Sequence, residues 1–337
     1  MQNSKQMLRN LIIFIILMFL TFVLVFKNYD FNNTFNIILK VDYKYIILAT
    51  IVMFLNITIE SYNIKNILYS LGKKVSLPKI IKYSLIGFFF SGITPAAGGG
   101  QPMEIYYMKK DKIPVNSSTI ALLLETCSFH IVTIIWGLIG VIINHKLLNK
   151  GLVIIFIVGM FLKLLILLIM LICLFWKKLS DFLINIFLKF LTKIKYRNLE
   201  EISNNVKEFL KQYHDSSLFI KKHKGILLKS IIIVSFQVLM YYSVTYFVYR
   251  SFNLNDYSYF KIITLQALLF VSVASIPLPG AVGISESTFL KLYITIFGAS
   301  NLASALVLSR GINFYLFMII SMIIVIFSMY IPKKKKI

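Results

Sequence analysis

Residues 83–108 read YSLIGFFFSGITPAAGGGQPMEIYYM, and this stretch decides the fold. It is apolar enough to enter a bilayer, but the run from Pro95 to Gly100 interrupts it in the middle. Lysines, which mark the cytoplasmic side of a membrane, flank it at both ends: Lys73, Lys74, Lys79, Lys82, Lys109, Lys110 and Lys112. The segment is therefore predicted to enter and leave on one side. Irregular backbone survives at membrane depth only where protein or a water-filled cavity satisfies it, which is typical of a transport site.

The composition of the whole chain indicates a membrane protein. Of 337 residues, 58% are hydrophobic and the mean hydropathy is +0.80, whereas soluble domains have about 45–50% apolar residues. We expect an all-α polytopic fold, with residues 1–337 forming a single integral membrane domain. The net charge of +23 lies mostly in loops between spans, so no nucleic-acid partner is expected. The four histidines and two cysteines show no metal-ligand spacing, and neither a metal nor a cofactor is expected.

Apolar runs of suitable length predict six full spans, at about 8–26, 43–61, 115–143, 151–176, 225–249 and 302–331. The first resembles a signal peptide but lacks a small-residue cleavage site, so we expect it to be retained. Two further apolar segments are interrupted: 83–108, and 261–297, which is broken between Pro277 and Gly283.

The charge distribution predicts the orientation. We assign five segments to the cytoplasm: the N-terminus, 60–82, 109–114, 177–224 and 332–337. They contain 25 of the 36 Lys and Arg residues, as the positive-inside rule requires. The external loops contain seven and are 27–44, 144–150, 249–261 and 298–301. Both termini are then cytoplasmic, and the two broken segments are re-entrant hairpins that enter from opposite sides.

This topology relates two halves of the chain, about 43–143 and 225–331, in inverted orientation. Paired broken hairpins in inverted halves indicate a transporter with a site near the membrane midplane. The sequences around the breaks, 91–98 and 275–282, agree weakly. The alternative is that both interrupted segments are kinked full spans, which would leave the C-terminal lysines inside as well.

The longest polar stretch, 177–224, begins with apolar residues at helical spacing interleaved with lysines. It is predicted to form an amphipathic helix on the inner leaflet, where its 11 basic against 5 acidic residues favour anionic lipid. A connector packed on the helical bundle is the alternative.

Glu104 and Glu286 occupy matching places in the two broken segments. With Pro102 as the first helical residue and Gly283 as a cap, each glutamate would be the third residue of an outgoing helix. A glutamate there can cap free N–H groups. Alternatively, the two helix N-termini face each other and attract an anion such as a phosphate, while the carboxylates hold an ammonium group.

Arg310 lies about eight residues into the last predicted span. A guanidinium in hydrocarbon is costly and needs a partner, which we expect to be Glu286. Arginine also binds phosphate through two parallel hydrogen bonds, so Arg310 is either a structural ion-pair partner or a phosphate ligand.

Other polar groups within the apolar segments are candidates as well. Glu125 and Lys163 can pair between adjacent spans, and His130 can titrate or bond to a neighbour. Gln101, Gln237 and Gln266 can line a site or join helices. The predicted substrate-binding set is Gly98, Gly99, Gly100, Gln101, Glu104, Gly280, Gly283, Ser285, Glu286 and Arg310. No nucleotide-binding motif surrounds the glycines and no catalytic set is evident, so ATP hydrolysis is not expected.

The segments 92–104 and 277–286, together with Arg310, resemble the lysylphosphatidylglycerol synthase transmembrane region, the flippase-like part of the multiple peptide resistance factor. The resemblance spans roughly 8–331. It implies a multi-pass protein of the bacterial cytoplasmic membrane that moves phosphatidylglycerol or its aminoacyl derivative to the outer leaflet, linked to resistance against cationic peptides.

In full-length members of that family a cytosolic domain carries the lysyltransferase, and the largest loop here, about 48 residues, is too short to hold it. We therefore expect a stand-alone translocating region that works alone, as a homo-oligomer or beside a separate synthase. The alternatives are an ion-coupled transporter of a small solute and a lipid-modifying membrane transferase.

Overall fold

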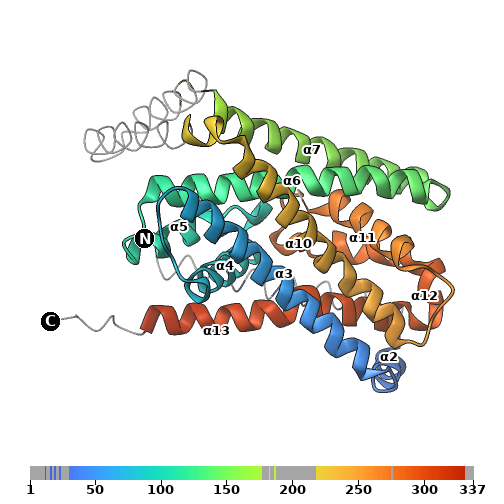
Figure 1. The fold of residues 1–337 in the computed structure, drawn as a ribbon. Coiled ribbons are helices and arrows are strands. Elements are labelled where there is room, and N and C mark those ends of the chain that lie inside the picture. Colours follow the sequence, from blue (N-terminus) through green and yellow to red (C-terminus); the bar gives the residue numbers. More distant parts are fainter. Residues whose placement is uncertain are drawn as a thin grey trace.

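The computed structural model describes residues 30–176 and 218–330 except Ser275, together with Ile12, Ile16, Phe19, Val23, Phe182 and Ile186. Within these residues every regular element is helical (Figure 1). The expected first span at 8–26 and the expected amphipathic helix of 177–224 lie largely outside the described residues, so both stay predictions.

The described part of the chain contains five continuous helical stretches that are long and apolar enough to cross a membrane. Four of them are α3 (Tyr43–Ser70), α6 (Val115–Asn144, continued by η2, His145–Leu147), α7 (Lys150–Phe175) and α10 (Lys224–Ser251). The fifth runs through α12 (Ile284–Arg310), the π-helical η4 (Gly311–Leu316) and α13 (Phe317–Tyr330). The protein is therefore a multi-pass helical membrane protein.

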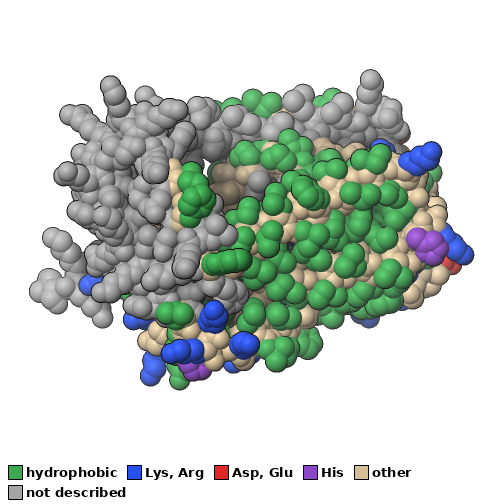
Figure 2. Space-filling view, turned by 90° about the horizontal axis from the view of Figure 1, so that it is seen from above, with side chains coloured by type: hydrophobic (Ala, Val, Ile, Leu, Met, Phe, Trp, Pro, Cys, Tyr) green, Lys and Arg blue, Asp and Glu red, His purple; other side chains and the backbone are tan. Residues whose placement is uncertain are grey.

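The surface of the molecule agrees with this class. Figure 2 shows a face covered by hydrophobic side chains, with lysine and arginine side chains near its edges. On α7, Ile154, Ile157, Phe161 and Leu168 are each about half exposed or more. Large contiguous apolar surfaces are rare on soluble monomers, and here they mark the area that contacts lipid.

Helices α3 and α10 pack along each other through the centre of the molecule, and α6 packs against both (Figure 1). A chain of buried hydrogen bonds joins these three helices. Asn63 Nδ2 donates to Ser230 Oγ at 2.9 Å, and Ser230 Oγ donates to Ser128 Oγ at 2.8 Å. Small polar side chains of this kind hold helices together where apolar packing alone gives no preference over lipid.

Two helix pairs with broken connections lie beside this centre. We call them the first hairpin, α4 (Leu77–Gly92), η1 (Pro95–Ala97) and α5 (Gly100–Lys110), and the second hairpin, α11 (Tyr259–Val273), η3 (Pro279–Ala281) and α12 as far as Gly298. At about 1.5 Å per residue, even the 16-residue α4 is only about 24 Å long, less than the ~30 Å hydrocarbon core.

The two hairpins have the same kind of tip. Each tip is a one-turn 3₁₀ helix that begins with proline and ends with an alanine in the left-handed region, Ala97 with φ 56° and Ala281 with φ 50°. The tips η1 and η3 contact each other. The weak sequence agreement between 91–98 and 275–282 thus corresponds to two similar one-turn tips, which differ in that Gly280 of η3 also has a positive φ, 57°.

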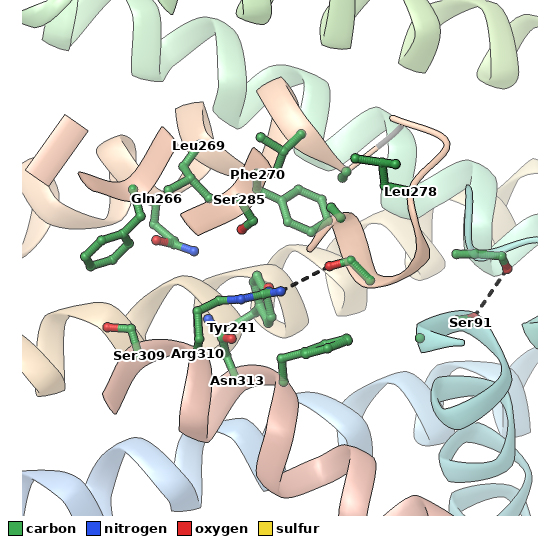
Figure 3. Close-up of a pocket in the computed structure, with 18 of the residues that line it drawn as sticks. Ser91, Tyr241, Gln266, Leu269, Phe270, Leu278, Ser285, Ser309, Arg310 and Asn313 are labelled. Carbon is green, nitrogen blue, oxygen red and sulfur yellow. Dashed lines mark hydrogen bonds between the residues drawn. The ribbon is translucent and has the colours of Figure 1, made fainter. Parts of the chain in front are cut away.

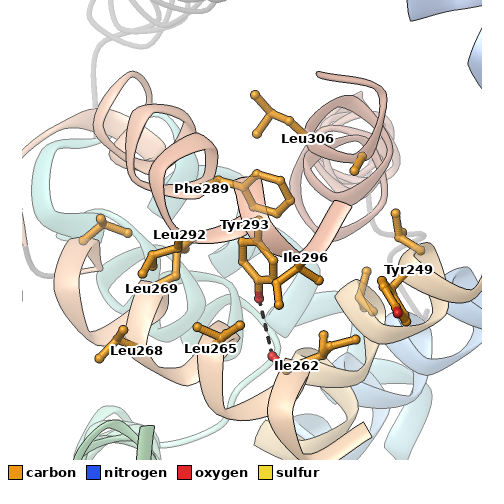
Figure 4. Packing of buried hydrophobic residues seen from close by; sticks show 14 of the residues in the cluster. Tyr249, Ile262, Leu265, Leu268, Leu269, Phe289, Leu292, Tyr293, Ile296 and Leu306 are labelled. Carbon is orange, nitrogen blue, oxygen red and sulfur yellow. Dashed lines mark hydrogen bonds between the residues drawn. The ribbon is translucent and has the colours of Figure 1, made fainter. Parts of the chain in front are cut away.

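The apolar core around the second hairpin is built on Tyr293 of α12 (Figure 4). Its ring stacks on Phe289 at a centroid distance of 4.4 Å. Its hydroxyl donates to Gln266 Oε1 at 3.1 Å, which also accepts a 3.0 Å hydrogen bond from Thr245 Oγ1. Gln266 therefore joins α10, α11 and α12, one of the two roles expected for it.

Two boundaries differ from the sequence-based expectation. Helix α3 does not end near residue 61 but continues to Ser70, because no proline or glycine interrupts it before Gly72. The loop expected at 298–301 is also absent, since Ala299–Asn301 are helical and only Gly298, with φ 71°, breaks the helix.

Ahead of α3, the short α2 (Phe31–Ile38) packs on α12, where Ser304 Oγ donates to Thr34 O at 3.1 Å.

Close packing of α7 on α11 depends on Gly159. A Cβ at this position would lie 2.3 Å from Val271 O and 2.6 Å from Ser272 O. Gly151 lies in the same helix, and a Cβ there would meet only Asn149 Oδ1, at 3.5 Å.

We predict that Gly159→Ala lowers the free energy of unfolding by about 1–3 kcal/mol, because a methyl group there overpacks the contact with α11. Gly151→Ala, the matched control, should be neutral or slightly stabilising, because alanine is the better helix former. Thermal unfolding in detergent, followed by loss of the monodisperse chromatographic peak, measures both. Equal melting temperatures for the two variants would contradict the packing of α7 on α11 described here.

Candidate functional site

The second hairpin turns into α12 at Gly283, whose φ of 91° suits glycine. Glu286 Oε2 accepts a 2.7 Å hydrogen bond from the Gly283 N–H. The sequence-based expectation that Gly283 is the cap and Glu286 the third helical residue is confirmed, and the carboxylate stabilises a helix start whose backbone donors would otherwise lack partners.

The other oxygen of Glu286 binds Arg310. Arg310 Nε donates to Glu286 Oε1 at 2.8 Å. Arg310 Nη2 donates to Gly280 O at 3.1 Å, the hydrogen bond drawn at Arg310 in Figure 3. The expected partner of Arg310 is therefore correct. Tyr315 OH adds a 3.5 Å hydrogen bond to the same carboxylate oxygen. These contacts join the tip of the second hairpin to the end of α12 and to η4.

The ion pair is almost fully removed from water. The side chains of Arg310 and Glu286 are only 10% and 5% exposed. The guanidinium also lies over the Phe314 ring, 4.5 Å from its centroid. The free-energy cost of burying two charges is offset only when the ion pair has good geometry and further partners. Here the Gly283 N–H, the Gly280 carbonyl and the Phe314 ring are those partners.

A cavity of about 240 Å³ lies where the two hairpin tips meet. The first hairpin contributes Ser91 and Ala97, and the second contributes Leu278 and Gly280. Figure 3 shows Arg310 and Asn313 on one wall, with Gln266, Phe270 and Ser285 opposite. Most of the lining is apolar, and the few polar groups converge from several helices, which is the usual make-up of a ligand site.

Two polar atoms of the lining residues are buried without a hydrogen-bond partner in the described part of the chain, Ser309 Oγ and Asn313 Oδ1. Buried polar groups in proteins are nearly always bonded, so these two atoms are suited to bond to a molecule that enters the cavity. Asn313 belongs to η4, and π-helical turns occur frequently at functional sites.

Of the predicted substrate-binding residues, Gly280, Ser285 and Arg310 line this cavity, and Gly283 and Glu286 support it from behind. Gly98, Gly99, Gly100 and Gln101 of the first hairpin are not among its lining residues.

The glycines of the first hairpin have a packing role. Gly99 N donates to Thr94 Oγ1 at 2.9 Å. A Cβ at Gly100 would lie 2.0 Å from Ser91 Oγ, so only glycine allows α5 to approach α4 this closely. Gln101 Nε2 donates to Thr126 Oγ1 of α6, an interhelical contact.

Glu104 is not the third residue of its helix, and that expectation is wrong. Helix α5 begins at Gly100, two residues before Pro102, so Glu104 lies further along the helix than expected. Glu104 instead packs beside Gly87 of α4, and its Oε2 atom is buried with no partner in the described residues. It lies near two further carboxylates, Glu60 and Glu125, that repel its charge.

Glu125 and Lys163 do not pair, as no ion pair within 4 Å joins them among the described residues. Thr126 Oγ1 donates to Glu125 Oε2 at 3.2 Å. Lys163, only 2% exposed, places Nζ 4.8 Å from the centroid of Phe270 and 5.6 Å from that of Phe129. His130 lies near Lys163, and the His130 Nδ1 atom is buried with no partner in the described part of the chain.

Sequence reasoning missed Ser309, Asn313, Tyr241 and Glu60. Serine, asparagine and tyrosine are common in membrane helices, and only Asn313, three residues after Arg310, carried a usable signal, because i and i+3 share a helix face. Glu60 was placed in a loop by the early end assumed for α3.

Long apolar helices, with a cavity between two broken helix pairs and a buried ion pair beside it, define a polytopic membrane protein with an internal site. The profile of the lysylphosphatidylglycerol synthase transmembrane region matches residues 7–321, and the chain belongs to that family. No curated protein matches the chain. Family membership supports a lipid-related role in a membrane.

We predict that Arg310→Met lowers the free energy of unfolding by about 3–5 kcal/mol, because it leaves the Glu286 carboxylate buried and unpaired. Adding Glu286→Gln to that variant should recover part of the loss, since the remaining side chain is neutral. Arg250→Met is the matched control, because the hydrogen bonds of that guanidinium go to tyrosine hydroxyls, at 3.4 Å. Unfolding in a mixed-detergent titration measures these three variants beside the wild type, and a double variant no more stable than Arg310→Met would rule out the pair as described.

Proposed function

We propose that this protein translocates a polar phospholipid, phosphatidylglycerol or an aminoacylated form of it, across the bacterial cytoplasmic membrane. The observation that carries the proposal is the cavity between the two hairpin tips, where Arg310 lies beside the unpartnered Ser309 and Asn313. Membership of a family defined by a lipid-synthase membrane region supports a lipid as the substrate.

The proposed topology has both termini in the cytoplasm and two re-entrant hairpins in inverted halves of one membrane domain. Three features support it: helices too short to span the membrane, matching tips, and lysines at both ends of the first hairpin. In Figure 1, α4 and α5 lie on one side of the molecule's centre and α11 and α12 on the other. Their meeting point is then near the midplane, as in transporters with inverted repeats.

The size of the cavity fits a headgroup. Ligand sites for drug-sized molecules enclose about 300–1,000 Å³, and this cavity is smaller, at about 240 Å³. It accommodates a phosphate with a small polar group but no acyl chains, which would stay in the surrounding lipid. Arg310 would move its Nη2 donor from Gly280 O to the phosphate, because a guanidinium binds a phosphate through two parallel hydrogen bonds.

An aminoacyl headgroup adds an ammonium, and the acidic group of Glu60, Glu104 and Glu125 would attract it. Gly87, which contacts Glu104, lies one helical turn from the cavity-lining Ser91 on α4. Phosphate and ammonium of one headgroup would thus interact with the second and the first hairpin respectively. Such charge separation would favour aminoacylated over plain phosphatidylglycerol.

We predict that Ser309→Ala combined with Asn313→Leu slows lipid translocation at least about tenfold, the effect of removing roughly 1.4 kcal/mol of substrate interaction. The double variant should fold normally, because it replaces buried polar atoms that lack partners with apolar groups. The assay reconstitutes the protein with fluorescent phosphatidylglycerol or lysylphosphatidylglycerol and follows outer-leaflet exposure with a membrane-impermeant reagent, with and without a membrane potential or pH gradient.

Ser287→Ala is the control, because Ser287 is an exposed residue of the same α12 whose hydroxyl bonds only to Ile284 O, at 3.1 Å, among the described residues. It should translocate lipid at the wild-type rate. Exposure no faster than in empty liposomes under every gradient would reject the lipid proposal for these substrates. Uptake of a small anion by the same proteoliposomes would then favour a small-solute transporter.

A further inference from the structure

A second and larger cavity, of about 460 Å³, lies away from the central one. It is formed by the first part of α4, the end of α5 and the last part of α13. Its lining residues are Pro78, Ile81, Lys82, Leu85, Tyr107, Lys110, Asp111, Ile324, Phe327 and Ser328. None of them was singled out as a site residue by the sequence pattern, although Lys82 and Lys110 were noted as flanking charges.

The charged part of this groove is organised by Asp111. Lys82 Nζ lies 3.3 Å from Asp111 Oδ2, and the Tyr83 hydroxyl donates to the same oxygen. Lys110 Nζ lies 5.6 Å from the centroid of the Tyr107 ring. Lys82 and Lys110 thus line the groove together with Asp111, and the exposed Lys79, Lys109 and Lys112 lie outside its lining.

The remaining walls are apolar and open toward lipid. Ile81 and Leu85 of α4 face Ile324 and Phe327 of α13 across the groove. Phe327 is 60% exposed, and Ile323 and Ile326 on the same helix are more than 40% exposed. The groove is apolar where it opens on a lipid-facing helix, and two lysines are among its lining residues. These features are complementary to a phospholipid with an anionic headgroup.

The groove is aligned with the central cavity. On α4 the lining residues continue at helical spacing from Ile81 and Leu85 in the groove to Phe88 and Ser91 in the central cavity. Between the two, Met318 fills the space over Gly92, where a Cβ would lie 2.4 Å from its Sδ, and Phe88 packs on Phe314 at a centroid distance of 6.2 Å. Ser321 Oγ, on α13, is buried along this seam without a partner in the described residues.

We propose that this groove binds an anionic phospholipid of the cytoplasmic leaflet, with the phosphate between Lys82 and Lys110 and an acyl chain against Leu85 and Phe327. The binding stands on the geometry and charge of the groove, and the choice of leaflet rests on the proposed topology. Its use as the loading position for the central cavity, past Met318, rests on the proposed translocation.

The test uses phosphatidylglycerol with a photoactivatable group in one acyl chain, reconstituted with the whole protein in nanodiscs of zwitterionic lipid. After illumination, crosslinked peptides are identified by mass spectrometry. We expect labels on α4 and α13 around Leu85 and Phe327. Lys82→Gln with Lys110→Gln should lower this labelling on the order of tenfold, the loss expected for two lysine charges beside a lipid phosphate. Ser328→Phe, which fills the groove without changing charge, should lower it as well.

The matched control is Lys79→Gln with Lys109→Gln, which removes the same charge from the same end of the molecule but from outside the groove. It should label as the wild type does, and excess soluble glycerol phosphate should not compete. Equal loss in both double variants, labelling confined to other helices, or displacement by glycerol phosphate would overturn the proposal. Labelling needs no transport, so a protein that labels at the groove but moves no lipid would reject the translocation and keep the groove.

Discussion

The arrangement of the central site depends on one buried ion pair, Glu286–Arg310. The carboxylate caps the start of α12 with one oxygen and binds the guanidinium with the other, and the guanidinium reaches back to Gly280 O at the hairpin tip. In the proposed topology the tip of the second hairpin lies at membrane depth, where these charged groups would satisfy its broken backbone. The same pair places a cation at the cavity where the two tips meet. Stability and substrate recognition would then use the same residues, so a substrate phosphate must compete with interactions that hold the tip in place.

The two hairpins share a backbone design but differ in chemistry. Both tips have a proline, a 3₁₀ turn and a left-handed alanine. Behind the second tip lies a glutamate paired with an arginine, whereas the glutamate behind the first tip lies near two other carboxylates. The second hairpin thereby presents an arginine paired with a glutamate, and the first hairpin presents a group of carboxylates. A substrate with both charges would be matched by both hairpins, and a plain anion by only one.

Much of this architecture could be predicted from the sequence, because its strongest signals are physical constraints. A proline and glycines inside an apolar run predicted both breaks, and a lone arginine in hydrocarbon predicted its partner Glu286. Position within a helix was less predictable: Pro102 suggested a helix start, but α5 begins at Gly100 and Glu104 makes no cap. Ser309 could not be found, since an ordinary polar residue acquires significance only when packing leaves it buried without a partner. Asn313 could have been found from its spacing to Arg310, and Glu60 was missed because α3 was expected to end near it. The groove beside α13 needed the structure, because its walls come from residues more than 200 positions apart.

The most direct test of the central claim is whether the two hairpin tips touch in the membrane. In a cysteine-free background, Ala97→Cys on η1 and Leu278→Cys beside η3 would be treated in native membranes with a short bifunctional thiol reagent. Ala97→Cys with Gly298→Cys, at the far end of the second hairpin, would be the control pair. Contact between η1 and η3 predicts rapid intramolecular crosslinking of the tip pair, identified by mass spectrometry, and none of the control pair. Reactive but uncrosslinked tip cysteines in a folded protein would contradict a site formed where the hairpins meet.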